Sequence, residues 1–264
     1  MELSREVVKA FRLSGELVPL EGGQHTSVRI GQGVLKPVED ARHVEWLLTR
    51  MDELNPEGYR VSKPIRSKSG TFVHQGWACS HYEEGQHVSG RIEEKLQVSR
   101  LFHRDLASVP VQGFPHPDNP WAQGHRIAWQ LERLPKEMPD EIHEVIVPLL
   151  QRVSLKRTYT MQIVHGDLAG NILFDPQLSP LIIDFSPTVA PVEYAEAILV
   201  CDCIAWQGCQ AAELGLLPDT QLYREMIVRA VVFRLSVAAL FSKWDANSFN
   251  GEVQAFKPIL ESIR

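Results

Sequence analysis

The chain has 264 residues, which is enough to bury a large core as one domain or as two lobes, and its formal net charge is −6. That acidity disfavours a nucleic-acid partner and is compatible with a cationic small substrate. We expect a cytoplasmic protein without a membrane partner, because no run of about eighteen apolar residues occurs and the first residues are charged where a signal peptide is apolar.

The first part of the chain is predicted to be rich in strands. Residues 4 to 13 have the pattern of a short amphipathic helix capped by Ser4, and short strands are expected at 17–20, 27–30 and 34–38. A glycine pair lies between the first two strands, where backbone N–H groups can approach phosphates closely; an ordinary hairpin loop is the alternative. The residues considered for phosphate binding are Gly22, Gly23, Gln24, His25 and Thr26.

Helical patterns become more frequent further along the chain. The apolar spacing over 40–54 predicts a helix capped by Asp40, and strands are expected at 59–65 and 71–79. An amphipathic helix is predicted over 89–108, and the long irregular segment 109–124 is a candidate border of a ligand pocket. Further helices are predicted at 140–153, 192–214, 220–243 and 248–263, so the chain is expected to be all-helical after Asp184.

One stretch carries most of the functional information. Residues 164–174 read VHGDLAGNILF, and a second carboxylate follows in Leu181-Ile182-Ile183-Asp184-Phe185. In phosphoryl transfer, a first Asp can orient or deprotonate the attacking hydroxyl, while an amide and a second Asp supply hard oxygen ligands to magnesium. Asp167, Asn171 and Asp184 occur in that order. A hairpin whose Asp and Asn residues only form turns is the alternative, and it leaves Asp167 and Asp184 unexplained.

This stretch resembles the aminoglycoside phosphotransferase and choline kinase branch of the protein-kinase-like superfamily. The resemblance implies an α+β, two-lobe fold, in which the small lobe has an antiparallel sheet with one or two helices and the large lobe is mainly helical. It places a nucleotide-binding lobe at residues 1–81 and a catalytic and acceptor-binding lobe at residues 82–264.

The same resemblance implies roles for residues outside the motif. Lys36 occupies the strand position of the lysine that pairs with the α and β phosphates, and Glu45 is the candidate carboxylate that positions it, with Glu39 and Glu53 as competitors. The inter-lobe linker, whose backbone groups bond the adenine, corresponds to Ser80, His81 and Tyr82.

The sequence departs from the expected pattern in three respects. The Asp167-to-Asn171 spacer is one residue shorter than the family's usual four, Ser186 replaces the glycine usual after Asp-Phe, and no Ala-Pro-Glu signature or long activation segment follows. The last of these departures argues against a protein kinase. The tail FSPxxxPxEYAEAxxxxDCxxW also resembles an actinobacterial set of phosphotransferase-like proteins, and this resemblance implies no particular acceptor.

We therefore predict an enzyme, a phosphotransferase that uses ATP and Mg²⁺ and moves the γ-phosphoryl group to a hydroxyl of a small molecule. Asp167 is the predicted catalytic residue, and Asn171 and Asp184 are the predicted metal ligands. A nucleotide-binding sensor or scaffold without turnover is the alternative. Glu193 and Glu196 could meet a cationic acceptor, although glutamates are expected at a helix start in any case.

Asp202 lies in a strongly apolar helical stretch, so its carboxylate needs a hydrogen-bonding or cationic partner. In kinase-like folds an Asp on the corresponding helix accepts bonds from backbone N–H groups of the catalytic loop. Asp202 is therefore predicted to brace His165 and Gly166. Exposure on a narrow stripe, or pairing with Arg229 or Arg234, remain the alternatives.

Overall fold

The computed structural model describes residues 3–20, 26–154 and 158–263, and the chain divides into two compact units. Unit 1 comprises residues 1–86, 112–117 and 173–185, and unit 2 comprises residues 87–111, 118–172 and 186–264. The first break, after Gln86, lies near the predicted boundary after residue 81. Residues 112–117 and 173–185, which the prediction placed in the second lobe, belong to unit 1.

Unit 1 is built on an antiparallel sheet with the strand order β1-β2-β3-β6-β5. The elements of this part are α1 (Arg5–Ala10), β1 (Leu17–Pro19), β2 (Val28–Ile30), β3 (Gly33–Pro37), α2 (Ala41–Glu53), β5 (Val73–His74) and β6 (Trp77–His81). Ser4 caps α1 and Asp40 caps α2, as predicted. The β2–β3 turn requires glycine at Gly31, because its φ is +57° and a Cβ there would lie 2.4 Å from the Ser14 carbonyl oxygen.

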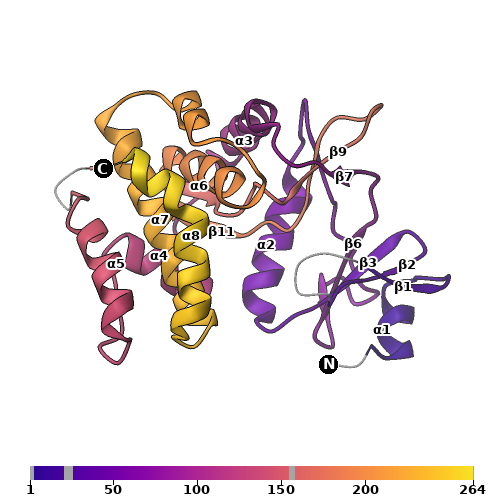
Figure 1. The fold of residues 1–264 in the computed structure, drawn as a ribbon. Coiled ribbons are helices and arrows are strands. Elements are labelled where there is room, and N and C mark those ends of the chain that lie inside the picture. Colours follow the sequence, from indigo (N-terminus) through magenta and orange to yellow (C-terminus); the bar gives the residue numbers. More distant parts are fainter. Residues whose placement is uncertain (1–2, 21–25, 155–157, 264) are drawn as a thin grey trace. The chain divides into compact units, whose positions relative to one another are not determined.

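Helix α1 covers one face of this sheet (Figure 1). Val7 and Phe11 on the helix pack against Ile30, Leu35 and Trp77 on the strands, and all five side chains are buried. The alternation along β3 turns Leu35 into this core and leaves its neighbour Lys36 partly exposed. The hydrophobic pattern therefore decides which face of the strand carries the lysine.

A second sheet has the order β4-β10-β9-β7 and was not predicted. Its strands are β4 (Arg60–Val61), β7 (Gln86–His87), β9 (Ile172–Phe174) and β10 (Leu181–Ile182). Strand β10 pairs in parallel with β4. The Arg60 side chain strengthens this pairing, because it donates to the Ser179 carbonyl oxygen (2.9 Å) and binds the Glu83 carboxylate (3.0 Å). The strand that precedes Asp184 is thus fixed to unit 1.

Unit 2 is mainly helical. Its elements are α3 (Ile92–Leu106), α4 (Pro120–Ala128), α5 (Asp140–Leu150), β8 (Gln162–His165), β11 (Pro187–Ala190), α6 (Val192–Trp206), the 3₁₀ helix η1 (Ala211–Leu216), α7 (Gln221–Phe241) and α8 (Ala246–Ser262). Helix α7 contacts α4, α5, α6 and α8 (Figure 1). Both α6 and α7 are apolar nearly all round, which matches this central position.

Three details differ from the predicted elements. The segment 109–124 is not wholly irregular, because α4 starts at Pro120 with Asn119 as its N-cap. The chain after Asp184 is not all-helical, because β11 pairs antiparallel with β8. The predicted helix 192–214 ends at Trp206, and Gly208 follows with a φ of +74°. Within the described ranges, no helix combines the length and apolar character needed to cross a membrane.

Candidate functional site

Asp167 and Asn171 lie in unit 2, in the loop between β8 and β9, and the structure brings their side chains together. Asn171 Nδ2 donates to the Asp167 carboxylate (3.1 Å) and to the Asp167 carbonyl oxygen (2.6 Å). The Asn171 backbone N–H closes the turn on the Leu168 carbonyl oxygen (3.0 Å). The short spacer therefore forms a tight turn, in which the amide nitrogen of Asn171 is used by Asp167.

The Asp167 carboxylate is also held by Arg234 of α7. Arg234 Nη2 donates to Asp167 Oδ1 (2.6 Å), and the same guanidinium binds Asp202 through Nε (2.9 Å) and Nη2. Arg234 and Asp202 are buried, whereas 36% of the Asp167 side chain is exposed. The rings of Trp121 and Trp206 lie 5.5 and 5.2 Å from the guanidinium carbon and screen it from water.

These contacts set the charges of the three groups. Burial favours protonation of Asp167, but the charge and hydrogen bond of Arg234, together with His165 and the Asn171 hydrogen bond, outweigh it and hold the pKa of Asp167 below its ordinary value. For Asp202, burial outweighs the arginine and raises the pKa to about 7. Arg234 stays charged, because the two carboxylates raise its pKa although burial alone would lower it.

The predicted bracing of the catalytic loop by Asp202 is wrong. The His165 N–H donates to His103 Nε2 (3.0 Å), and the Gly166 N–H donates to the Ser186 carbonyl oxygen (2.9 Å). The donors expected to meet Asp202 therefore have other partners. The alternative of pairing with an arginine of α7 is confirmed.

His103 of α3 is a positioning residue that sequence reasoning missed. Its Nε2 accepts the His165 N–H, so the neutral ring carries its proton on Nδ1, which faces the Ser99 hydroxyl at 3.2 Å. Burial lowers the pKa of His103 to about 3, with a smaller contribution from His165. His165 Nδ1 in turn accepts the Asp167 N–H (3.0 Å). The only sequence signal was a histidine on the apolar face of the helix predicted over 89–108.

His125 of α4 explains the glycine in the His-Gly-Asp motif. A Cβ on Gly166 would lie 2.9 Å from His125 Nε2, so a larger residue would push the ring away. The ring is fixed, because it stacks on Phe233 at 3.8 Å and its Nδ1 lies 3.1 Å from the Tyr194 hydroxyl. Burial and the Arg234 charge lower the pKa of His125 to about 3, so it is neutral at physiological pH.

In unit 1 the structure pairs Lys36 with Asp184, two candidates chosen from separate parts of the sequence. Lys36 Nζ forms an ion pair with Asp184 Oδ1, and 38% and 41% of the two side chains are exposed. Partial burial lowers the pKa of Lys36 to about 8. Asp184 has a φ of +51°, a left-handed conformation that costs energy for a residue with a Cβ. Backbone strain of this kind clusters at functional sites.

Glu45 does not pair with Lys36, contrary to the role suggested by the resemblance. Both carboxylate oxygens of Glu45 accept the Phe72 N–H at 3.0 Å, and one accepts the Val73 N–H at 2.9 Å. Two backbone donors thus satisfy the carboxylate, and Glu45 fastens α2 to the start of β5. Among the described residues, the ion pair of Lys36 is the one with Asp184.

The predicted nucleotide loop is described only at its end. Gly22, Gly23, Gln24 and His25 lie outside the described residues, and Thr26 is exposed.

In the linker, the backbone N–H groups are already used within unit 1. The His81 N–H donates to the Lys63 carbonyl oxygen (2.8 Å), and the Tyr82 N–H donates to the Gln32 carbonyl oxygen (2.8 Å). Ser80 pairs with Val34 in the β3–β6 ladder. An adenine at this segment would have to bind through groups other than the His81 and Tyr82 amides.

Glu196 is not available to a cationic acceptor. Arg100 binds both of its carboxylate oxygens (2.9 and 3.1 Å), the Tyr223 hydroxyl donates to one of them (3.0 Å), and its side chain is buried. This removes one of the two glutamates that suggested a cationic substrate. Glu193, the other one, is partly exposed.

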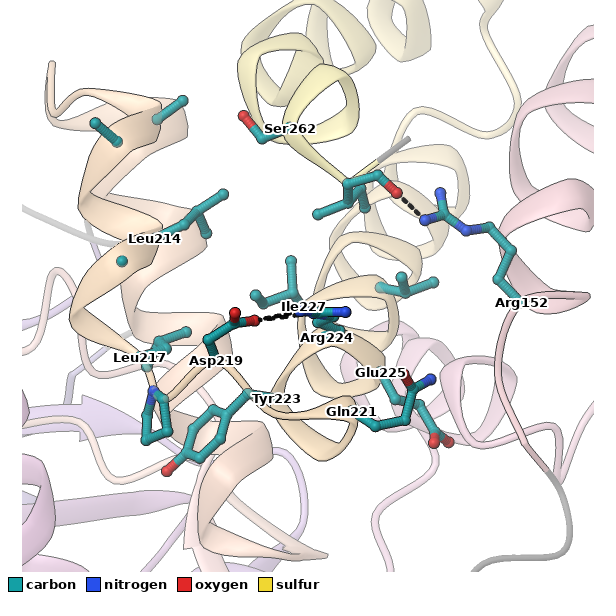
Figure 2. A pocket seen from close by; sticks show the side chains of 16 residues that line it. Arg152, Leu214, Leu217, Asp219, Gln221, Tyr223, Arg224, Glu225, Ile227 and Ser262 are labelled. Atoms are coloured by element: carbon teal, nitrogen blue, oxygen red, sulfur yellow. Dashed lines mark hydrogen bonds and ion pairs between the residues drawn. The ribbon is translucent and has the colours of Figure 1, made fainter.

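A cavity of about 780 Å³ lies in unit 2 between η1, the start of α7 and the end of α8 (Figure 2). Its walls include Leu214, Leu217 and Ile227, and Arg224 pairs with Asp219 within it (2.6 Å). None of the residues around the Asp167 carboxylate lines this cavity. We therefore do not assign it to the acceptor.

Comparison with solved structures identifies the fold. The chain matches aminoglycoside phosphotransferase APH(4)-Ia with a TM-score of 0.63 at 16% identity, over 96% of this chain and 97% of that one. It matches choline kinase LicA from Streptococcus pneumoniae with 0.65 at 12%, over 98% and 96%. It matches amicoumacin kinase hAmiN, solved with AMP-PNP, Ca²⁺ and Ami, with 0.64 at 14%, over 98% and 94%.

These matches confirm the predicted protein-kinase-like fold and, at the level of fold, the resemblance read from the sequence. No protein-family model matches the chain, and no curated protein matches its sequence.

Proposed function

We propose that the protein is an ATP-dependent phosphotransferase that moves the γ-phosphoryl group to a hydroxyl of a small molecule. The observation that carries this proposal is the ion pair between Lys36 of β3 and Asp184, which joins the predicted phosphate-binding lysine to the predicted metal ligand. The structural neighbours support the same class, because they include kinases of small molecules and one of them was solved with ADP and hygromycin B.

The chemistry of the two proposed ligands suits a magnesium ion. Mg²⁺ is usually held by one or two carboxylates together with substrate phosphates and water, and the Asp184 carboxylate in unit 1 and the Asn171 amide oxygen in unit 2 are each hard oxygen donors of this kind. Among the described residues, no group of three or more His, Cys, Asp or Glu side chains is arranged around a metal position.

Each residue then has a defined task. The bound magnesium nucleotide supplies the phosphoryl group and neutralises part of its charge. Lys36 binds the nucleotide phosphates. Asp167, held in one orientation by Arg234, accepts the hydrogen bond of the acceptor hydroxyl and receives its proton. Positioning and charge neutralisation supply most of the rate enhancement, because little covalent chemistry is required of the protein.

The test is a calorimetric titration with ATP in the presence and absence of Mg²⁺, followed by a transfer assay against aminoglycosides, amino alcohols, sugars and nucleosides. Asp184→Ala is expected to abolish magnesium-dependent binding, because it removes the charged ligand. Asp175→Asn is the matched control, because Asp175 Oδ1 only caps the turn of the same β9–β10 hairpin (2.8 Å to the Gln177 N–H).

Unchanged magnesium-ATP affinity in Asp184→Ala contradicts the assignment. Nucleotide binding without magnesium and without transfer or hydrolysis would instead identify a sensor that kept the fold and lost turnover.

A further inference from the structure

Lys95 of α3 is a buried lysine that the proposed reaction does not use. Only 1% of the residue is exposed, and it takes part in none of the ion pairs of the described residues. Its Nζ donates to Gln207 Oε1 at 2.6 Å. Burying an ammonium group without a carboxylate is costly, and burial lowers the pKa of Lys95 accordingly. A residue that only filled this space could be apolar, so the polar end of Lys95 calls for another explanation.

The contacts of Gln207 fix the orientation of its side-chain amide. Oε1 accepts from Lys95 Nζ and from the Gly90 N–H (3.2 Å), and the Cys203 thiol lies 3.5 Å away on the same side. Ammonium and backbone N–H groups can only donate, so the amide oxygen must face them. The Nε2 group therefore faces the other way, where it donates to the Ala169 carbonyl oxygen at 2.9 Å.

Ala169 lies between Asp167 and Asn171 in the loop that carries the proposed chemistry. It is buried, and its carbonyl oxygen would lose a hydrogen bond if Gln207 turned around. The loop has its own internal bonds, but those join residues of the loop to one another. The Gln207 bond ties the middle of the loop to the end of α6, and through Lys95 to α3.

We propose that Lys95 and Gln207 form a positioning pair for the loop 167–171, in which Lys95 orients the Gln207 amide and Gln207 holds the Ala169 carbonyl group. The inference rests on the proposed function, since the loop bears Asp167 and Asn171. Neither residue touches substrate; both act through the backbone of the loop. A shift of about 1 Å in a reacting group can lower the rate by about 10²-fold, so one lost bond here is enough to affect turnover.

Gln207→Glu separates positioning from simple stabilisation. The carboxylate keeps the acceptor for Lys95 and gives the buried ammonium an opposite charge, but it has no N–H to donate to Ala169. We expect a melting temperature no lower than that of the wild-type protein, a kcat at least tenfold lower, and a KM for ATP within twofold. Gln97→Glu is the matched control, because Gln97 is an exposed residue of α3, and it should leave all three values unchanged.

Lys95→Met provides the second variant. Replacing a buried charge by an apolar side chain of similar length is often neutral or stabilising, whereas the Gln207 amide oxygen then keeps only the Gly90 N–H and the weakly donating Cys203 thiol as hydrogen-bond donors and is held less firmly. We expect an unchanged or higher melting temperature together with a kcat that is lowered, but by a smaller factor than in Gln207→Glu. Turnover is measured with Mg²⁺-ATP and the acceptor found in the transfer assay, or as slow ATP hydrolysis.

Hydrogen exchange of the backbone amides in the loop 167–171 tests the pair without relying on turnover. Exchange should be several-fold faster in Gln207→Glu than in Gln97→Glu and wild type. Wild-type kcat and wild-type exchange in Gln207→Glu would overturn the proposal, as would a loss of kcat that only follows a lowered melting temperature. If no variant and no wild-type sample turns over ATP, the proposed function fails, and the exchange rates still decide whether the pair holds the loop.

Discussion

Asp184 and Asp167 are both aspartates near the end of a short strand, but their surroundings differ. Asp184 has a flexible lysine as its ion-pair partner, and 41% of its side chain is exposed. Asp167 is bound by a buried arginine and by Asn171. An exposed pair can exchange partners at little cost, whereas a buried guanidinium fixes a carboxylate in one orientation.

This difference matches the two proposed tasks. If Asp184 holds magnesium as proposed, it would have to exchange Lys36 for the metal ion, and Lys36 would then be available to the nucleotide phosphates. The residue that accepts the acceptor's proton has to keep its orientation through the reaction, because orientation carries much of the rate. Four experiments test the comparison, and they follow from the largest expected effect to the smallest.

Arg234→Met should give the largest loss. It leaves Asp202 buried without a cation and Asp167 without the guanidinium that orients its carboxylate. Breaking a buried ion pair typically costs about 3–5 kcal/mol of folding free energy. Urea unfolding measures the loss. Asp202→Asn should cost less, because Arg234 keeps its bond to Asp167. A free energy of unfolding of Arg234→Met within about 1 kcal/mol of the wild-type value would contradict this role of the Arg234 ion pairs.

Asp167→Asn should lower turnover by about 10²-fold or more, because positioned general bases typically contribute that much. Nucleotide affinity should stay within about a few-fold, since Asp167 is not a proposed metal ligand. Steady-state kinetics and calorimetry measure the two quantities, with Asp175→Asn as the control. Wild-type turnover in Asp167→Asn would remove Asp167 from the mechanism.

Acid should destabilise the protein through His103. Its pKa is about 3 in the folded protein against an ordinary value of 6.5, so between these values the unfolded chain binds a proton that the folded chain does not. The contribution of His103 to stability is therefore complete above pH 6.5 and is lost as the pH drops towards 3, by up to about 1.4 kcal/mol per pH unit.

The control for this effect is His103→Gln, measured by urea unfolding from pH 7.5 down to pH 5. Asp202 acts in the opposite direction, because its raised pKa makes the folded state lose stability as the pH rises towards about 7. The Asp202 contribution cancels in the difference in unfolding free energy between wild type and His103→Gln. This difference should shrink as the pH falls. A difference that does not depend on pH would show that His103 is protonated in the folded protein without cost.

Lys36→Met should have the smallest effect on stability, below about 1 kcal/mol, because both partners of its ion pair are more than one third exposed. Its nucleotide affinity should nevertheless fall markedly. Glu94→Gln breaks the similarly exposed Arg91–Glu94 pair and should change stability as little, with no change in nucleotide affinity. Equal nucleotide affinities in the two variants would exclude Lys36 from phosphate binding.

Several features could be predicted from the sequence because local patterns determine them. Ser4 and Asp40 cap their helices through bonds to N–H groups three residues away. The apolar alternation that buries Leu35 places Lys36 on the other side of β3. The motif identified Asp167, Asn171 and Asp184 as a set, and the resulting fold class is confirmed by the solved structures.

Only the tertiary structure decided the partners of these residues. Glu45 could have met Lys36, but the packing of α2 brought it to the Phe72 and Val73 amides. Asp202 needed a partner, as its apolar surroundings predicted, and α7 supplied Arg234 across 32 residues of sequence. A buried polar group must be paired, so the sequence can state that a partner exists; which donor reaches it depends on how the helices pack.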